Sequence, residues 1–189
     1  MTGGAAGSGG VAGSGGAGGG GGNTLCTEPD PIAPACLLGP GQAVCKCSDE
    51  AAILLPMLAN AAQSAFITGG DLCWSAISVP ATVPAAKYYV PCSQFATDFH
   101  TGDVDTGWIC LGISMPETIH CRYTYTKGSS PVTVAHGGPN GVNGAESFEV
   151  AAEGDQNGDG ITSAFTITGQ VNAGGQLVIS PMFADKPQE

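Results

Sequence analysis

A short acidic loop near the C-terminus carries the residues best suited to chemistry. Residues 155–160 read Asp-Gln-Asn-Gly-Asp-Gly, so that oxygen-bearing side chains recur at every second position, at Asp155, Asn157 and Asp159. Such oxygens can converge on one hard cation, and the closing glycine lets the chain turn back sharply. With the Ile161 carbonyl as a further ligand, the sequence predicts a calcium site.

The loop departs from the full EF-hand pattern, and this departure bears on its affinity. The position at which an EF-hand supplies a bidentate glutamate is occupied by Thr166. A ligand such as Glu153 would have to compensate, and we expect an affinity near the millimolar level of extracellular calcium modules. The alternative is an Asx/Gly turn that binds no ion.

A second group of candidate ligands lies upstream and consists of Asp98, His100, Asp103 and Asp105. Imidazole and carboxylate groups of this kind can bind a transition metal. The same residues are also typical of a solvated loop in which aspartate and glycine make turns. Both interpretations remain open from the sequence.

Motifs that would identify an enzyme do not occur in the sequence. There is no G-x-S-x-G and no H-E-x-x-H pattern. His120 and His136 have no serine or cysteine partner in a nucleophile motif, and oxidised cysteines could not act as nucleophiles. We therefore expect a non-catalytic protein. A calcium-stabilised extracellular hydrolase stays as an alternative, because carboxylates distant in sequence can meet in space.

Composition restricts the partners and suggests the domain organisation. The net charge is -11 and the chain has only five Lys and Arg, so we expect no nucleic-acid partner. Residues 1–22 are almost wholly Gly, Ala and Ser and hold 13 of the 31 glycines, which predicts a disordered, flexible tether. Residues 23–189 fit one domain with its own core.

The eight cysteines are Cys26, Cys36, Cys45, Cys47, Cys73, Cys92, Cys110 and Cys121. An even number in one modest domain favours disulfides, and hence an extracellular, cell-surface or periplasmic location. No C-x-x-C pair occurs, which argues against a zinc ribbon. The sequence leaves the connectivity open. Our hypothesis pairs Cys110 with Cys121 and Cys73 with Cys92, and pairs the four upstream cysteines among themselves.

Two features bear on membrane attachment. Residues 51–70 carry no charge, but Pro56 and polar residues interrupt them and acidic residues precede them, so we expect no transmembrane segment. Met1 and Thr2 are followed by glycine instead of a basic and apolar leader. We expect that a leader or membrane anchor has been lost upstream, or that the glycine tract is a tether behind a removed leader.

One helix is predicted at about residues 49–68. Ser48 can cap it, Asp49 and Glu50 suit the positive end of the helix dipole, and two glycines stop it. Pro56 must kink the helix or mark its first turn. Its apolar stripe is predicted to comprise Ile53, Leu54, Met57, Leu58, Ala61, Ala62 and Ala65.

The rest of the domain is predicted to be a long loop followed by antiparallel strands. The loop covers residues 71–107, and the strands lie within residues 108–181. The predicted strands are residues 108–114, 118–126, 147–153, 163–168 and 176–180. In the second of them, Ile119, Cys121, Tyr123 and Tyr125 share one face, while His120, Arg122, Thr124 and Thr126 take the other. A helix followed by such strands is an α+β fold.

Three stretches resemble type IV pilins and the related pseudopilins of type II secretion. The first is the connecting loop, residues 78–84 with 87–91. The second runs from Asp98-Phe99-His100-Thr101-Gly102-Asp103 through Gly107-Trp108 and Leu111-Gly112-Ile113-Ser114 to Arg122-Tyr123. The third and most specific joins Ala152-Glu153-Gly154-Asp155, Asn157-Gly158-Asp159-Gly160 and Ser163-Ala164-Phe165-Thr166, and ends near Ser180-Pro181. Together they cover roughly residues 71–189.

The resemblance implies one N-terminal helix laid across a four-stranded antiparallel sheet, the head of a subunit whose apolar stem anchors it in a membrane or filament. It also implies that some relatives hold calcium in a C-terminal loop. Pilins begin with a basic leader and an apolar stem, whereas this chain has glycine there. We expect a surface-exposed structural subunit or minor pilin head, whose partners are other pilin-like subunits or surface proteins. The alternative is a surface-tethered, lipoprotein-like binding module with a weak calcium site.

Overall fold

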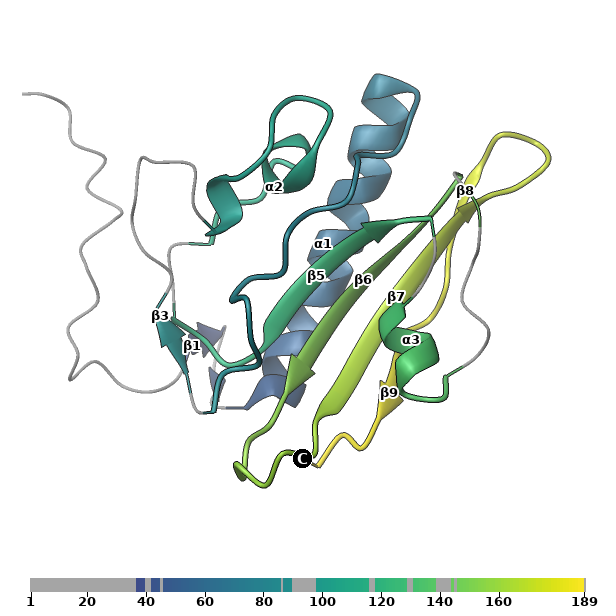
Figure 1. Ribbon diagram of the computed structural model, residues 1–189. Coiled ribbons are helices and arrows are strands. Elements are labelled where there is room, and N and C mark those ends of the chain that lie inside the picture. The colour runs from purple at the N-terminus through teal and green to yellow at the C-terminus, as the bar shows by residue number, and fades with distance from the viewer. Residues whose placement is uncertain are drawn as a thin grey trace, which may run out of the picture.

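The computed structural model describes residues 37–39, 42–44, 46–85, 87–89, 98–115, 118–128, 131–138, 144 and 146–188. Over these residues the fold is α+β, with one long helix packed against an antiparallel sheet (Figure 1). This confirms the predicted fold class. The glycine-rich tract predicted to be flexible, residues 1–22, lies outside the described residues.

The long helix, α1, spans Cys47–Gly69 and thus starts two residues earlier than predicted. The residue at its N-cap is Lys46, whose side chain makes no capping bond, so the predicted cap at Ser48 is wrong. Asp49 and Glu50 lie in the first turn, where the helix dipole favours negative charge. The helix ends at Gly70, whose positive φ of 78° closes the last turn.

The main sheet has five strands where the resemblance implied four. Its members are β5 (Arg122–Lys127), β6 (Ser147–Gly154), β7 (Ser163–Val171), β8 (Leu177–Ile179) and β9 (Phe183–Asp185). The order is β5-β6-β7-β8, all antiparallel, and β9 pairs with the other end of the long strand β7. The C-terminal strand β9 begins beyond the segment in which strands were predicted.

Smaller elements flank this sheet. Two of them are antiparallel strand pairs: β1 (Leu37–Gly39) with β2 (Gln42–Val44), and β3 (Tyr88–Tyr89) with β4 (Thr118–Ile119). The others are the short helices η1 (Asp98–His100), α2 (Gly107–Cys110) and α3 (Pro131–Ala135). Helix α3, which was not predicted, lies on the face of the sheet opposite α1 (Figure 1). The predicted loop 71–107 therefore contains β3 and η1 and ends at the start of α2.

The strand predicted at residues 108–114 is wrong, because this segment begins with the helical turn α2. Gly107 has a φ of 69°, and a Cβ there would lie 2.7 Å from the carbonyl oxygen of Thr101. This tight bend directs Trp108 into the core, where its indole N–H donates to the carbonyl of Ile77 at 2.9 Å. Burial of the indole outweighs the strand preference of the sequence.

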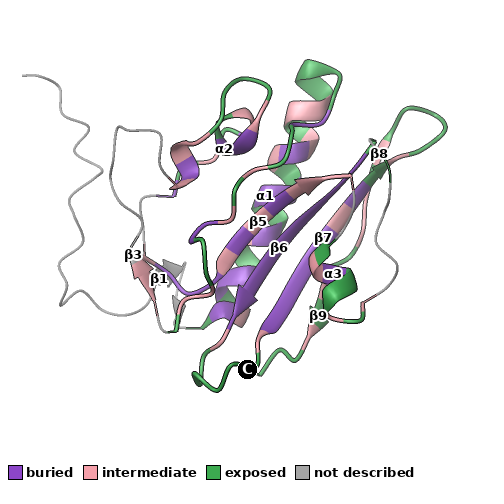
Figure 2. Cartoon of the chain, viewed as in Figure 1, coloured by how far each residue is buried: buried purple, intermediate pink, exposed green. Residues whose placement is uncertain are grey.

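The core lies between α1 and the sheet, and Figure 2 shows β6 buried along its length and β7 buried over its first half. The helix contributes Cys47, Ala51, Leu55, Leu58, Ala59 and Ala62, and the sheet contributes Tyr123, Tyr125, Phe148, Val150, Ala152, Phe165 and Ile167. The predicted stripe is wrong at Ile53 and Met57, which are 49% and 41% exposed. Since α1 is apolar nearly all round, its sequence does not define which face meets the sheet.

Two disulfides confirm that the domain is disulfide-stabilised but correct the hypothesised pairing. Cys47 bonds Cys121, and Cys73 bonds Cys110. The predicted hairpin that would have joined Cys110 to Cys121 does not form, because Cys110 belongs to α2. The other four cysteines, Cys26, Cys36, Cys45 and Cys92, lie outside the described residues.

A glycine at the end of β6 permits the close approach of α1. A Cβ at Gly154 would lie 2.5 Å from the Cβ of Cys47, the first residue of the helix. The Cys47–Cys121 bond therefore sits at a point where the helix lies close against the sheet.

Candidate functional site

The acidic loop predicted to bind calcium connects β6 to β7. Both carboxylate oxygens of Asp155 accept backbone N–H groups of glycines in the loop, at 2.9 and 3.0 Å. Asn157 Oδ1 accepts the N–H of Asp159 at 2.9 Å, and Asp159 Oδ1 accepts that of Ile161 at 2.8 Å. The four predicted ligand residues therefore lie together in one turn. The side-chain oxygens of Asp155, Asn157 and Asp159 stabilise this turn by accepting its backbone N–H groups.

Glu153, which was expected to compensate at the calcium site, and Thr166, which stands at the twelfth loop position, both have other partners. The Glu153 carboxylate faces Arg122 and His136 on the side of the sheet opposite α1. Thr166 is buried in β7, where its hydroxyl accepts that of Thr133 at 2.8 Å. Any calcium bound in the loop would therefore rely on the loop's own oxygens.

The second group of candidate ligands has structural partners of its own. Asp98 accepts the hydroxyl of Tyr88 at 2.9 Å, and Asp103 accepts the N–H groups of the second and third residues after it. His100 faces Ser114 at 3.5 Å. Within the described ranges, no three His, Cys, Asp or Glu side chains are placed to hold a metal ion. That observation does not bear on amide and carbonyl oxygens, so calcium binding by the acidic loop stays a prediction.

Glu50 in the first turn of α1 is fully buried and joins the helix to the sheet. Its carboxylate accepts the N–H of His120 at 2.9 Å, that of Cys121 at 3.3 Å and the hydroxyl of Tyr123 at 2.6 Å. The His120 imidazole lies 3.0 Å away, so His120 is buried and not on a polar strand face as predicted. Burial and then the charge of Glu50 raise the pKa of Tyr123 well above its ordinary value, which keeps the phenol a donor.

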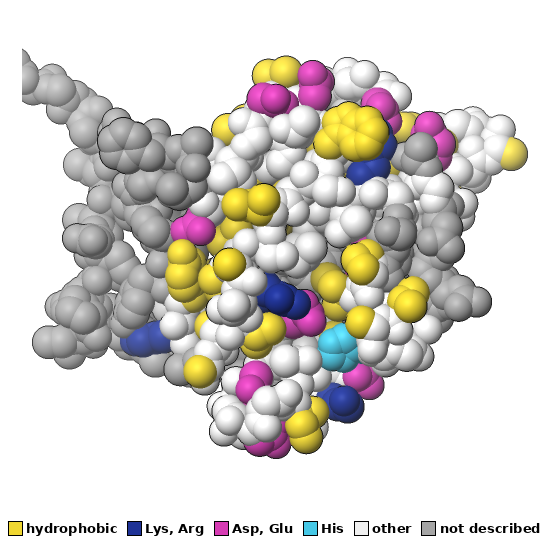
Figure 3. Space-filling view, in the orientation of Figure 1, with side chains coloured by type: hydrophobic (Ala, Val, Ile, Leu, Met, Phe, Trp, Pro, Cys, Tyr) yellow, Lys and Arg dark blue, Asp and Glu magenta, His cyan; other side chains and the backbone are white. Residues whose placement is uncertain are grey.

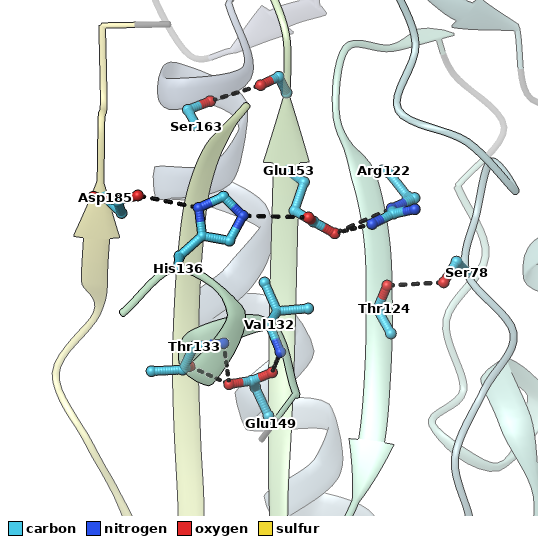
Figure 4. Close-up of polar contacts among 11 residues, drawn as sticks. Ser78, Arg122, Thr124, Val132, Thr133, His136, Glu149, Glu153, Ser163 and Asp185 are labelled. Carbon is cyan, nitrogen blue, oxygen red and sulfur yellow. Dashed lines mark hydrogen bonds and ion pairs between the residues drawn. The ribbon is translucent and has the colours of Figure 1, made fainter. Parts of the chain in front are cut away.

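The sheet face opposite α1 carries a row of ion pairs, which we call the ion-pair row (Figure 4). Arg122 of β5 donates through Nε to Glu153 of β6 at 3.1 Å, and also through Nη2. The other oxygen of Glu153 lies 3.6 Å from Nε2 of His136, whose Nδ1 lies 3.1 Å from Asp185 of β9. The row thereby connects β5, β6, the end of α3 and β9.

The ion-pair row resembles the base and orienting carboxylate of a hydrolase only in part. A general base needs one imidazole nitrogen facing a carboxylate and the other facing the group that it deprotonates. Both nitrogens of His136 face carboxylates. The hydroxyl of Ser163 lies on the other face of the sheet, toward α1, and donates to the Gly154 carbonyl at 3.1 Å. The geometry suits holding strands together better than activating a nucleophile.

Glu149 is a second buried carboxylate on this face. It accepts the N–H groups of Val132 and Thr133 at the start of α3, at 3.1 and 3.2 Å, and the Thr133 hydroxyl. Burial raises its pKa above the ordinary value, against the lowering effect of these donors. Its contacts fix α3 on the sheet.

The outward surface of α1 combines exposure with a lack of charge. No Asp, Glu, Lys or Arg occurs from residue 51 to residue 70. Ile53, Met57 and Ile67 are exposed, Ile67 by 74%. We call Ile53, Met57 and Ile67, with the exposed Pro56, the α1 outer face. Exposed Asn60 and Ser64 lie between Met57 and Ile67 on this face, so its contiguous apolar part is Ile53, Pro56 and Met57. Contiguous exposed apolar surface often marks a protein contact.

Helix α1 is long and apolar enough to cross a membrane by length and composition. Its most apolar 18-residue window has a mean hydropathy of 1.4, and 28% of that window is buried. The core helix of a soluble domain meets the same criterion, and α1 packs along β6 and β7.

Trp74, which no sequence motif marks as functional, is 59% exposed beside a hollow at the C-terminal end of α1. The amine of Lys127 lies 4.6 Å from the centre of its ring. The sequence offers one indication of an exposed tryptophan here, namely its place next to a cysteine in a segment rich in Ser and Pro. That pattern is not specific for a binding site.

Comparison of the chain with protein-family models, curated proteins and solved structures finds no match.

Proposed function

We propose that this protein is an exported, non-catalytic structural subunit with a pilin-like head, and that it acts through contacts made by the α1 outer face. The single observation that carries the proposal is the exposure of Ile53 and Met57 on a helix without charge beyond its first turn. Both side chains are already about half buried, so burying the remainder contributes roughly 1 kcal/mol each. Repeated along an array of subunits, this small contact becomes a stable one.

Two further observations support the proposal. A helix laid over an antiparallel sheet is the arrangement that the resemblance implies for a pilin head. The two disulfides are typical of proteins in oxidising compartments, which agrees with an extracellular, cell-surface or periplasmic site of action. The proposed partners are further copies of this chain or other pilin-like subunits.

The test replaces Ile53→Lys together with Met57→Lys and measures self-association by sedimentation velocity over a range of concentrations. We expect the native protein to associate and the double variant to sediment as a monomer, because two buried ammonium groups oppose packing of the helix faces. The matched control is Val134→Lys on α3, a residue that is 58% exposed, because α3 lies on the face of the sheet opposite α1. Native protein that stays monomeric at every concentration, or a double variant that associates as well as the control, contradicts the proposal.

We also propose that the acidic loop binds calcium weakly as a structural ion. The loop is already folded around Asp155, Asn157 and Asp159, and each carboxylate oxygen that accepts one N–H keeps a second lone pair for a cation. Binding to the native state alone raises its stability by mass action. At calcium tenfold above the dissociation constant we expect a rise of about 3–6 °C in the melting temperature.

The variant Asp155→Asn tests the calcium site, because it removes the charge of one predicted ligand. The matched control is Asp105→Asn, which removes the same charge in another loop. Calcium should stabilise the native protein and Asp105→Asn alike, and Asp155→Asn much less. Equal melting temperatures with and without several millimolar calcium in all three proteins would show an Asx turn that binds nothing.

A further inference from the structure

The hollow at the C-terminal end of α1 has a volume of about 380 Å³. It is lined by Ala65, Thr68, Gly69, Asp71, Leu72, Cys73, Trp74, Val104, Asp105 and Cys110. None of these residues belongs to the α1 outer face, to the acidic loop or to the ion-pair row. In the orientation of Figure 1, hydrophobic, acidic and basic side chains lie beside one another at the top of Figure 3, near the ends of α1 and α2.

The most prominent residue of the hollow is Trp74, whose side chain is exposed on a rigid backbone. The backbone N–H of Trp74 donates to the carbonyl of Asp105 at 2.9 Å, and the backbone carbonyl of Trp74 accepts the N–H of Gly107 at 3.1 Å. The preceding residue is held by the Cys73–Cys110 disulfide. An indole presented in this way offers a large contact area at a small cost in conformational entropy, as in the anchor residues of interfaces.

Negative groups outnumber positive ones around the hollow, even with the Lys127 amine counted. The C-terminal end of a helix carries partial negative charge, and the last turn of α1 has no basic residue to offset it. Asp71 and Asp105 add two carboxylates. Asp71 pairs with Lys127 at 2.8 Å, and this hydrogen bond lowers the pKa of Asp71, which stays ionised. In the part of the chain that the structure describes, no hydrogen bond or ion pair engages the Asp105 carboxylate.

We propose that this hollow binds the ammonium or guanidinium group of a Lys or Arg side chain from a partner polypeptide. An aromatic face beside carboxylates attracts such a cation, while the apolar stem of the side chain packs on the indole. The protein already shows one such contact within itself, since Lys127 lies over Trp74 and pairs with Asp71. The chain itself is strongly acidic, which favours a basic partner.

A sugar, the other common partner of an exposed tryptophan, fits the hollow less well. Sugar hydroxyls need donors as well as acceptors, and the charged groups that line the hollow are carboxylates. The nearby amine of Lys127 already donates to Asp71 and to the carbonyl of Leu72, at 2.8 and 3.0 Å.

The test titrates the intact protein with Nα-acetyl-lysine amide and follows the two tryptophan indole N–H signals by NMR. The chain has two tryptophans, and Trp108 is fully buried, so its signal serves as an internal reference. We expect the Trp74 signal to move with a dissociation constant in the millimolar range. The uncharged analogue Nα-acetyl-norleucine amide should bind at least tenfold more weakly, because it keeps the stem and lacks the cation.

Variants separate the parts of the site. Asp105→Asn should weaken lysine binding about threefold to tenfold, whereas Asp155→Asn, which removes the same charge elsewhere, should leave it unchanged. Trp74→Phe should keep part of the binding, and Trp74→Ala should abolish it in a protein with unchanged circular dichroism. For Trp74→Ala the signal followed is the backbone N–H of Asp105.

Three results would overturn the proposal: equal binding of the norleucine analogue, a response to the disaccharide cellobiose without a response to lysine, or no response to any probe. The site does not depend on the proposed assembly. Ile53→Lys with Met57→Lys should leave lysine binding intact, and Asp105→Asn should leave self-association intact, so each idea can fail alone.

Discussion

Glu50 shows how one buried side chain interrupts a strand. The sequence pattern predicts continuous pairing over residues 118–126, but the extended segments are β4 and β5, with His120 and Cys121 between them. The N–H groups of those two residues donate to the Glu50 carboxylate instead of to a neighbouring strand. A buried carboxylate needs several hydrogen-bond donors, and here two of them are backbone N–H groups that would otherwise pair with a neighbouring strand.

Glu149 leads to a prediction about pH. Because burial raises its folded pKa above the ordinary 4.5, the folded protein binds this proton more tightly than the unfolded chain does. The stability that the group contributes is present at low pH and is lost as the pH rises from about 4.5 through the raised pKa. We expect the free energy of unfolding of the native protein, minus that of Glu149→Gln, to fall with rising pH.

Urea unfolding of the two proteins at a series of pH values measures this difference. Taking the difference cancels the other titrating groups and any constant effect of the substitution. A difference that is flat or that rises over the acidic range would show that burial does not dominate the ionisation of Glu149.

At the scale of elements, α1 has two faces that the sequence alone does not distinguish. Leu55 is fully buried against the sheet, while Ile53, two residues earlier, is half exposed. We expect Leu55→Ala to lower the free energy of unfolding by about 3 kcal/mol, because it removes buried methyl groups and leaves a cavity. Ile53→Ala should change it by less than about 1 kcal/mol.

Chemical denaturation of the two variants, with the same denaturant slope as the native protein, gives this comparison. Equal losses at both positions would mean that the helix is rotated relative to the sheet. The Ile53→Ala variant also serves in the self-association test beside the lysine substitutions, because it shortens the side chain without adding a charge to the α1 outer face.

At the scale of the whole molecule, the Cys47–Cys121 bond joins the start of α1 to the sheet across 74 residues of sequence. Replacing both cysteines by alanine should lower the free energy of unfolding by about 4 kcal/mol, because the unfolded chain regains the closed loop's entropy. The matched control, Cys73→Ala with Cys110→Ala, opens a 37-residue separation and should lose slightly less. Thermal or urea unfolding measures both, and a loss under about 1 kcal/mol for the first pair would contradict the expectation.

Local patterns in the sequence were sufficient for much of the fold. The helix is specified by Asp49 and Glu50 at its start and Gly70 at its end, all of which act within one turn. Strand β6 shows apolar alternation at Phe148, Val150 and Ala152, strand β7 is rich in β-branched residues, and the acidic loop between them is a run of turn-forming residues. These features depend on neighbours in sequence and can therefore be recognised without coordinates.

Contacts between distant residues were decided by the tertiary structure alone. The pairing of Cys47 with Cys121, the burial of His120, and the ion-pair row through His136 each join segments that no local pattern connects. The exposure of Trp74 likewise depends on a loop folded beside α1 from 30 residues further along, near Val104 and Asp105. A sequence specifies side-chain chemistry and local geometry, whereas partners across the fold follow from how the faces of α1 and the sheet pack together, and that packing is a property of the whole chain.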